Sequence, residues 1–210
     1  MNKHRYEIRT CRSCGLRYPL TSGHSFGERC PLCLGKTVLI HQKEVDVEHM
    51  TRTRERRSKT GFRAILLDNI RSAWNVGSIL RSADGFGFDH AYLCGITPTP
   101  ENEAVTKTSL GAEEYVTWSH HKDAVKLIHG LKKEGWNILA LEEDERSKKI
   151  SRLKQPAEVK TVLILGSEVT GVDPGLLDLA GAIVHIPMRG QKRSLNVAIA
   201  FSVAAYALFG

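Results

Sequence analysis

A series of short apolar runs, beginning at Ala64, constrains the fold of this chain more than any other feature. Several runs are rich in Ile, Leu and Val, and they cover residues 64–67, 91–94, 138–141, 162–165 and 183–186. Each run is too short for a globular helix, and continuous apolar runs of this length are typical of strands buried on both faces of a parallel sheet. Residues 76–86 and 120–134 carry apolar side chains at helical spacing. The alternation of strands and helices predicts an α/β domain.

Two Cys-x-x-Cys pairs, Cys11 with Cys14 and Cys30 with Cys33, mark the N-terminal part of the chain. Disulfides are unusual in a cytosolic protein, so pairs with this spacing indicate metal ligands. Four thiolates suit a tetrahedral structural zinc ion, and a closed site of this kind leaves no open position for catalysis. Residues 1–48 contain little continuous apolar sequence, so we expect the metal to supply the missing stability. The pairs also resemble the knuckles of rubredoxin, which hold iron, but the short interval and the attached domain favour zinc.

The charge of the chain favours a polyanionic partner. The formal net charge is +7 at pH 7, and a basic balance promotes binding to RNA or DNA through counterion release. Residues 49–62 form a basic linker, which is either a solvated tether or a strip that contacts phosphates. The sequence contains neither an apolar stretch long enough to cross a bilayer nor a signal peptide at its start. We therefore expect a cytoplasmic protein with no membrane partner.

Three glycine-bearing segments follow predicted strands. The first, residues 68–87, enters a helix that Asn75 can cap, and Arg81 falls off the apolar stripe of that helix. Arg81 is therefore either a solvent-facing residue or a ligand for phosphate or substrate near the strand ends. The second segment, residues 165–172, is a glycine turn that contains Glu168.

The third segment, residues 186–197, is a basic loop in which Ser194 lies where a helix begins and can serve as its N-cap. The helix that follows is apolar nearly all round, which requires burial on several sides. Packing against a second copy of the chain is one way to achieve that burial.

Taken together and in this order, the segments resemble the three motifs of the TrmH family in the SPOUT superfamily of methyltransferases. The first resembles the family's asparagine, glycine and arginine motif that ends in Phe-Gly, and the second resembles its Gly-x-Glu-x-x-Gly motif. The third resembles its Ile-Pro-Met-x-Gly…Ser-Leu-Asn-Val motif. The resemblance covers residues 63–210, with small departures such as Ala198, where a serine is common. It leaves the N-terminal cysteine module unexplained.

The resemblance implies a fold and a cofactor. Members of the family have an α/β sheet whose C-terminal part forms a deep trefoil knot, and the knot loops bind S-adenosylmethionine. We therefore expect a SPOUT methyltransferase domain at residues 63–210, preceded by the linker at 49–62 and a zinc-ribbon-like module at 1–48. By carry-over, five residues at strand ends are expected to line the cofactor pocket: Leu141, Gly166, Ile186, Met188 and Leu195.

The resemblance also implies a reaction, the transfer of a methyl group to a ribose 2'-hydroxyl of tRNA or rRNA. Arg81 is expected to orient the hydroxyl and to stabilise developing negative charge, since a guanidinium stays protonated and is a poor base. Asn75, Ser194 and Asn196 are expected to position Arg81 and the ribose, and Glu168 to hold the cofactor loop. Members of the family are homodimers whose active sites draw on both subunits, and the apolar final helix fits this arrangement.

Two other functions remain open at this point. One is a non-catalytic, zinc-ribbon RNA-binding protein in which the knotted domain is only a dimer scaffold. The other is methylation of a base, as in some other SPOUT families, although the Ser-Leu-Asn-Val motif favours ribose.

Overall fold

The structure is a computed structural model that describes residues 3–46, 61–153, 155–156 and 158–210. The chain divides into two compact units, residues 1–56 and residues 57–210. The basic linker predicted at residues 49–62 lies almost wholly outside the described residues, so neither of its two interpretations is tested.

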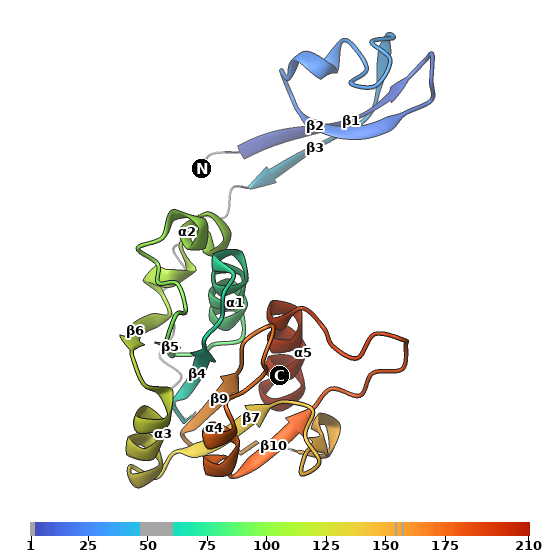
Figure 1. Ribbon diagram of the computed structural model, residues 1–210. Helices are drawn as coiled ribbons and strands as arrows, with labels where there is room; N and C mark the ends of the chain where they lie inside the picture. Colours follow the sequence, from blue (N-terminus) through green and yellow to red (C-terminus); the bar gives the residue numbers. More distant parts are fainter. Residues whose placement is uncertain (1–2, 47–60, 154, 157) are drawn as a thin grey trace. The chain divides into compact units, whose positions relative to one another are not determined.

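The smaller unit is a three-stranded antiparallel sheet (Figure 1) in the order β2-β1-β3. Its strands are β1 (Lys3–Cys11), β2 (Arg17–Thr21) and β3 (Thr37–Asp46), with a single 3-10 turn, η1 (Ser25–Gly27), before β3. The two cysteine pairs lie where β1 ends and just before β3 begins. The sheet therefore presents both knuckles at the same end of the unit.

The larger unit is built on a seven-stranded sheet in the order β6-β5-β4-β9-β7-β10-β8, and its strands pair in parallel. The strands are β4 (Arg63–Asp68), β5 (His90–Cys94), β6 (Thr117–His121), β7 (Asn137–Leu141), β8 (Lys148–Lys149), β9 (Thr161–Leu165) and β10 (Ala182–His185). The helices are α1 (Ala73–Gly85), α2 (Glu103–Ser109), α3 (Ala124–Lys133), α4 (Pro174–Leu179) and α5 (Val197–Phe209), with short turns η2 (Ala112–Glu114) and η3 (Ile150–Arg152).

Helices cover both faces of this sheet (Figure 1), and each face has its own apolar core. On β4, Ile65 and Leu67 pack into the core that includes α1 and α5, whereas Ala64 and Leu66 pack into the core that includes α3 and α4. All four side chains are completely buried. The central positions of a strand buried on both faces are apolar on both sides, which is why the sequence shows runs rather than alternation.

The predicted α/β architecture with a parallel sheet is confirmed, and each of the five apolar runs lies in a strand or at its end. In the larger unit two strands were not predicted, β6 and β8. Strand β6 reads TWSHH and lies at the edge of the sheet, where polar side chains are tolerated, so its sequence carries no apolar run. The helix predicted at residues 120–134 begins at Ala124, because His120 and His121 belong to β6.

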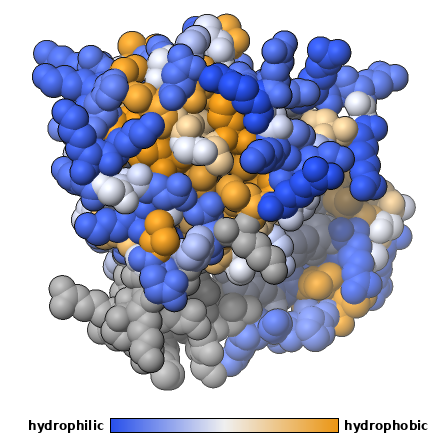
Figure 2. All heavy atoms as spheres, turned by 90° about the horizontal axis from the view of Figure 1, so that it is seen from below, coloured by the Kyte–Doolittle hydropathy of each residue, from blue (hydrophilic) through white to orange (hydrophobic). Residues whose placement is uncertain are grey.

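Within the described residues, none of the helices is both long and apolar enough to pass through a membrane. Seen from below (Figure 2), the surface carries exposed apolar areas that are bordered by hydrophilic side chains. The most exposed large apolar side chains of the larger unit include Trp74, Ile199 and Tyr206, which lie on α1 and α5.

Candidate active site

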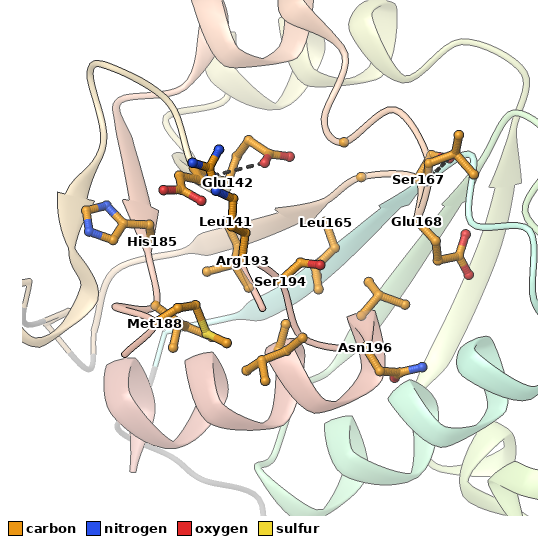
Figure 3. Close-up of a pocket in the computed structure, with 18 residues that line it drawn as sticks. Leu141, Glu142, Leu165, Ser167, Glu168, His185, Met188, Arg193, Ser194 and Asn196 are labelled. Carbon is orange, nitrogen blue, oxygen red and sulfur yellow. Dashed lines mark hydrogen bonds between the residues drawn. The ribbon is translucent and has the colours of Figure 1, made fainter. Parts of the chain in front are cut away.

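A cavity of about 600 Å³ opens at the carboxyl ends of β7, β9 and β10. Figure 3 shows its wall. Each of these strands contributes its last residue and the one after it, and most of the rest of the wall comes from the turn at residues 167–171 and from residues between 188 and 200. In parallel sheets this edge is where ligands bind, because the loops that leave neighbouring strands can surround a molecule there. The volume falls within the range of about 300–1,000 Å³ that is usual for small-molecule sites.

All five residues predicted to hold a cofactor lie in the wall of this cavity: Leu141, Gly166, Ile186, Met188 and Leu195. Their predicted role in binding stays a prediction. The structure gives Gly166 a reason of its own to lack a side chain. A Cβ atom there would overlap the backbone of Gly171 and Val172, so the turn after β9 closes tightly only with glycine at this position.

A hydrogen-bond chain joins the three glycine-bearing segments. Asn75 Nδ2 donates to Glu168 Oε1 at 2.9 Å, and Asn196 Nδ2 donates to Asn75 Oδ1 at 3.0 Å. These residues lie 93 and 121 positions from Asn75 in the sequence, yet the fold places them side by side. Glu168 and Asn196 also line the cavity, so the chain of hydrogen bonds fixes one part of its wall.

Glu168 also binds the start of helix α1. Its carboxylate accepts hydrogen bonds from the backbone N–H groups of Arg71 and Ser72, at 2.9 and 3.3 Å. Burial alone would raise the pKa of Glu168, but the hydrogen bonds from Arg71, Asn75 and Ser72 outweigh it and hold the pKa below its ordinary value. A negative charge is also favoured at a helix N-terminus, where backbone N–H groups point outward. The carboxylate is therefore ionised and tethered.

The capping alternatives for Asn75 and Ser194 are both wrong. Helix α1 is capped by Ser72, whose hydroxyl accepts from the backbone N–H of Asn75, and this leaves the Asn75 side chain available for Glu168. Helix α5 is capped by Asn196, whose side chain accepts from the N–H groups of Ala198 and Ile199. Ser194 lies before the helix, is exposed and lines the cavity.

Arg81 lies on the exposed side of α1, as its position off the apolar stripe predicted. It follows Asn75 by six residues, so the two side chains point about 120° apart and lie about 9 Å apart along the helix axis. Among the described residues of one chain, Arg81 is not part of the cavity wall. The structure therefore brings Asn75, Glu168, Ser194 and Asn196 to one place and leaves Arg81 outside it.

Several polar residues of the cavity were not predicted, among them Glu142, His185 and Arg193. Glu142 Oε2 accepts a hydrogen bond from the backbone N–H of Val172 at 2.9 Å, so it braces the far end of the turn after β9. The signal for Glu142 was its position directly after Leu141, where a strand that had already been predicted ends.

The four cysteines of the smaller unit form one cluster. Their Sγ atoms all lie within 4.8 Å of one another, with 3.4 Å between Cys11 and Cys33 and 3.7 Å between Cys14 and Cys30. Backbone N–H groups of Cys14 and Ser13 point at Cys11 Sγ and lower the pKa of this thiol. Four thiol groups this close, with N–H donors that stabilise a thiolate, can hold one metal ion.

The larger unit, a parallel α/β sheet with a ligand-sized cavity at its strand ends, has the SPOUT-type fold that solved methyltransferases share. The chain belongs to the SpoU rRNA methylase family, whose model matches residues 63–206. The predicted membership in the TrmH family of the SPOUT superfamily is thereby confirmed. Residues 1–62 lie outside the match.

Three similar proteins illustrate the relationship. A tRNA (guanosine(18)-2'-O)-methyltransferase of Thermus thermophilus is 31% identical over 144 residues, which are 68% of this chain and 71% of the relative. The crystal structure of an AdoMet-bound rRNA methyltransferase from Sinorhizobium meliloti has a TM-score of 0.66 at 26% identity, covering 71% of this chain but only 56% of that one. The TrmH/SpoU tRNA modifying enzyme of A. aeolicus has a TM-score of 0.63 at 26% identity, covering 71% and 74% of the two chains.

Proposed function

We propose that this protein transfers the methyl group of S-adenosylmethionine to a ribose 2'-hydroxyl of tRNA or rRNA. The observation that carries the proposal is the convergence of Glu168, Asn75 and Asn196, one from each family motif, at the wall of a single cavity. Similar proteins are named as methyltransferases of tRNA and of rRNA, and the tRNA enzyme of Thermus thermophilus is named as a 2'-O-methyltransferase.

The cavity fits the proposed cofactor in chemistry as well as in size. Its apolar wall, to which Leu141, Leu165 and Ile186 contribute, suits a flat heteroaromatic ring. Its carboxylates, such as Glu142 and Glu168, complement the hydroxyl groups and the positive charge of the same molecule. Backbone groups of Gly166, Ile186 and Leu195, which line the cavity, can bind the adenosine edge.

When bound, the cofactor supplies an activated methyl group, so the protein has only to place the 2'-oxygen in line with it and to accommodate the proton that the hydroxyl loses. Asn75 and Asn196 hold the start of α1 against the start of α5, and Ser194 extends from the loop beside them. Arg81 orients the hydroxyl and stabilises negative charge that develops on its oxygen. Transfer would form the bond between the methyl carbon and the 2'-oxygen and break the bond between that carbon and sulfur, so that the sulfonium would leave as a neutral thioether and the hydroxyl proton would pass to solvent.

The position of Arg81 outside the cavity of its own chain supports a homodimer in which the site draws on both copies. Helix α5 exposes an apolar stripe in which Ile199 is 55% and Tyr206 71% exposed. On the neighbouring helix α1, Trp74 lies seven residues before Arg81 and therefore points to nearly the same side. If this apolar surface is buried against a second copy of the chain, Arg81 lies next to the partner copy.

The cysteine cluster is proposed to hold a structural zinc ion. A tetrahedral zinc ion with bonds of about 2.3 Å places its sulfur ligands about 3.8 Å apart, and the separations of 3.4 and 3.7 Å are already close to that value. The four cysteines supply all the ligands that a tetrahedral ion needs. The neighbouring His24 lies outside the cluster, and its Nδ1 accepts from the backbone N–H of Phe26.

The test combines isothermal titration of the protein with S-adenosylmethionine and tritiated methyl transfer to total tRNA and, separately, to rRNA. We expect binding and labelled RNA. The variant Arg81→Ala should keep its affinity for the cofactor within about twofold and lose transfer by about 100-fold or more. Asp84→Ala, an exposed position on the same helix, is the matched control and should keep the full rate. Full transfer by Arg81→Ala would refute its catalytic role, and no cofactor binding by the native protein would favour the non-catalytic RNA-binding alternative.

A further inference from the structure

The two faces of the sheet in the smaller unit differ, and the pairing of its strands shows which residues lie on each. Tyr6 is opposite Thr21 on β2 and opposite Lys43 on β3. Ile8 is opposite Pro19 on β2 and opposite His41 on β3. Directly opposed residues, and residues two positions apart, share a face. We call this set the open face: Tyr6, Ile8, Pro19, Thr21, His41 and Lys43.

The opposite face is covered by the chain's own loop. Tyr18 donates from its hydroxyl to the carbonyl oxygen of Phe26 at 2.5 Å, and Thr37 Oγ1 donates to the carbonyl oxygen of Gly27 at 2.5 Å. Arg9, which is opposite Tyr18, contacts Thr37 from the same side. The loop at residues 24–28 therefore packs on this face, and the open face is turned away from it.

Charge is distributed unequally between the two faces. The acidic strand residues Glu7 and Glu44 lie on the covered face, where they pair with Arg9 at 2.7 Å and with Arg5 at 3.1 Å. Among the residues whose side chains are described, the open face contains no carboxylate. Its Lys43 is exposed, and so is His41. The open face is therefore cationic and is not neutralised from within the sheet.

Aromatic surface accompanies this charge. Tyr6 is 41% exposed, and it shares the face with the exposed imidazole of His41. The two lie in neighbouring rows of the sheet, about 7 Å apart along the strands. Exposed rings interleaved with cations on a sheet surface are the arrangement that binds single-stranded nucleic acid, because bases stack on the rings while cations contact phosphates.

We propose that the open face binds an unpaired segment of the RNA substrate, with bases stacked on Tyr6 and His41 and a phosphate contacted by Lys43. The inference rests on the proposed function, since that function makes RNA the substrate, and it assigns substrate selection to the smaller unit. A protein partner is the alternative occupant. Charge favours RNA, because a cationic face with exposed rings complements a polyanion that carries stackable bases.

The test measures the fluorescence anisotropy of a labelled single-stranded RNA of mixed sequence, and of the same strand annealed to its complement, with the full chain. Tyr6→Ala should weaken single-strand binding by about tenfold, and Tyr6→Phe, which keeps the ring, should restore it. Lys43→Gln should weaken binding and reduce the slope of log affinity against log salt by about 0.7. Gln42→Glu changes the net charge by the same amount on the covered face, and it should leave binding close to native.

Titration of S-adenosylmethionine into each variant separates this inference from the proposed function. Native cofactor affinity in Tyr6→Ala together with weakened RNA binding supports the inference. If the native chain bound RNA but no cofactor, the proposed function would fail. The RNA-binding role of the open face would still be tested by the same variants. Native RNA binding by both Tyr6→Ala and Lys43→Gln, or equal losses in Lys43→Gln and Gln42→Glu, would overturn the inference.

Discussion

Replacing Glu168 by glutamine removes one charge and one acceptor and preserves the shape of the side chain. The native carboxylate accepts from the backbone of Arg71 and Ser72 and from Asn75 Nδ2, at 2.9, 3.3 and 2.9 Å. If the amide oxygen of Glu168→Gln keeps the contacts of Oε1 with Asn75 and Ser72, its NH₂ group faces the N–H of Arg71, donor against donor. Hydrogen bonds to charged groups contribute about 1.5–3 kcal/mol, and a charge at a helix N-terminus contributes about 0.3–1 kcal/mol. Since Glu168 is partly exposed, the lower ends of these ranges apply, which gives a loss of about 2 kcal/mol in the free energy of unfolding.

The loss should appear in thermal unfolding as a fall of about 4–8 °C in the Tm. It should also weaken S-adenosylmethionine binding, because the turn at residues 167–171 forms part of the cavity wall. Glu145→Gln makes the same chemical change at another exposed carboxylate and is the control. A double-mutant cycle with Asn75→Ala should show a coupling energy of about 0.5–3 kcal/mol.

The same variant has a defined pH dependence. The pKa of Glu168 is lower in the folded protein than its ordinary value of 4.5, so its ionisation stabilises the fold fully above that pH. This contribution is lost as the pH falls through the folded pKa, and the native protein and Glu168→Gln should then converge in stability. Equal Tm values at pH 7, or a difference that persists unchanged at strongly acidic pH, would refute the reasoning.

Three further predictions concern packing, metal and assembly. Gly77→Ala should lower the free energy of unfolding by about 1–3 kcal/mol, because a Cβ at this position would overlap α2. Gly85→Ala, in open space on the same helix, should leave the free energy of unfolding unchanged. Urea unfolding measures both values. We expect mass spectrometry to find one bound zinc ion in the native protein and in Cys94→Ala, whose changed residue lies in the core of the larger unit, but not in Cys30→Ser. Tyr206→Glu should convert a dimer to a monomer in light scattering, because Tyr206 is 71% exposed on the apolar stripe of α5; a native protein that was itself monomeric would contradict the proposed assembly.

The parts of the fold that could be predicted are those in which local sequence carries the physical signal. Strands buried on two faces are apolar along most of their length, so β4 and β9 are visible as apolar runs in the sequence. Strand β6 carries no such run, because it lies at the sheet edge. The strands of the smaller unit were not predicted either, since its sheet is polar and largely exposed.

The sequence predicted which residues belong to the site but not how they are arranged. The motifs named Asn75, Glu168 and Asn196, but separations of 93 and 121 residues give no local sign that the three side chains bond to one another. The assignment of caps failed for a related reason. Ser72 and Asn75 can both cap a helix. In the structure Ser72 caps α1, and the side chain of Asn75 donates instead to Glu168, which lies on a loop 93 residues away in the sequence.

The knot, the roles of the site residues and the cytoplasmic location stay predictions. For the cavity, the ends of the predicted strands indicated the apolar wall. Glu142 was missed because it lies outside the three segments, and Arg193 because it is one of several basic residues in the loop of the third segment. Charged residues of this kind become visible only when the loops that carry them are folded around a common space.

The central claim, methyl transfer to a ribose 2'-hydroxyl, is tested most directly by alkaline hydrolysis of RNA labelled by the protein from tritiated S-adenosylmethionine. Alkaline cleavage requires attack by a free 2'-hydroxyl, so a methylated ribose protects the bond that follows it. We predict that the label appears in alkali-resistant dinucleotides. Label released in mononucleotides would place the methyl group on a base and contradict the account.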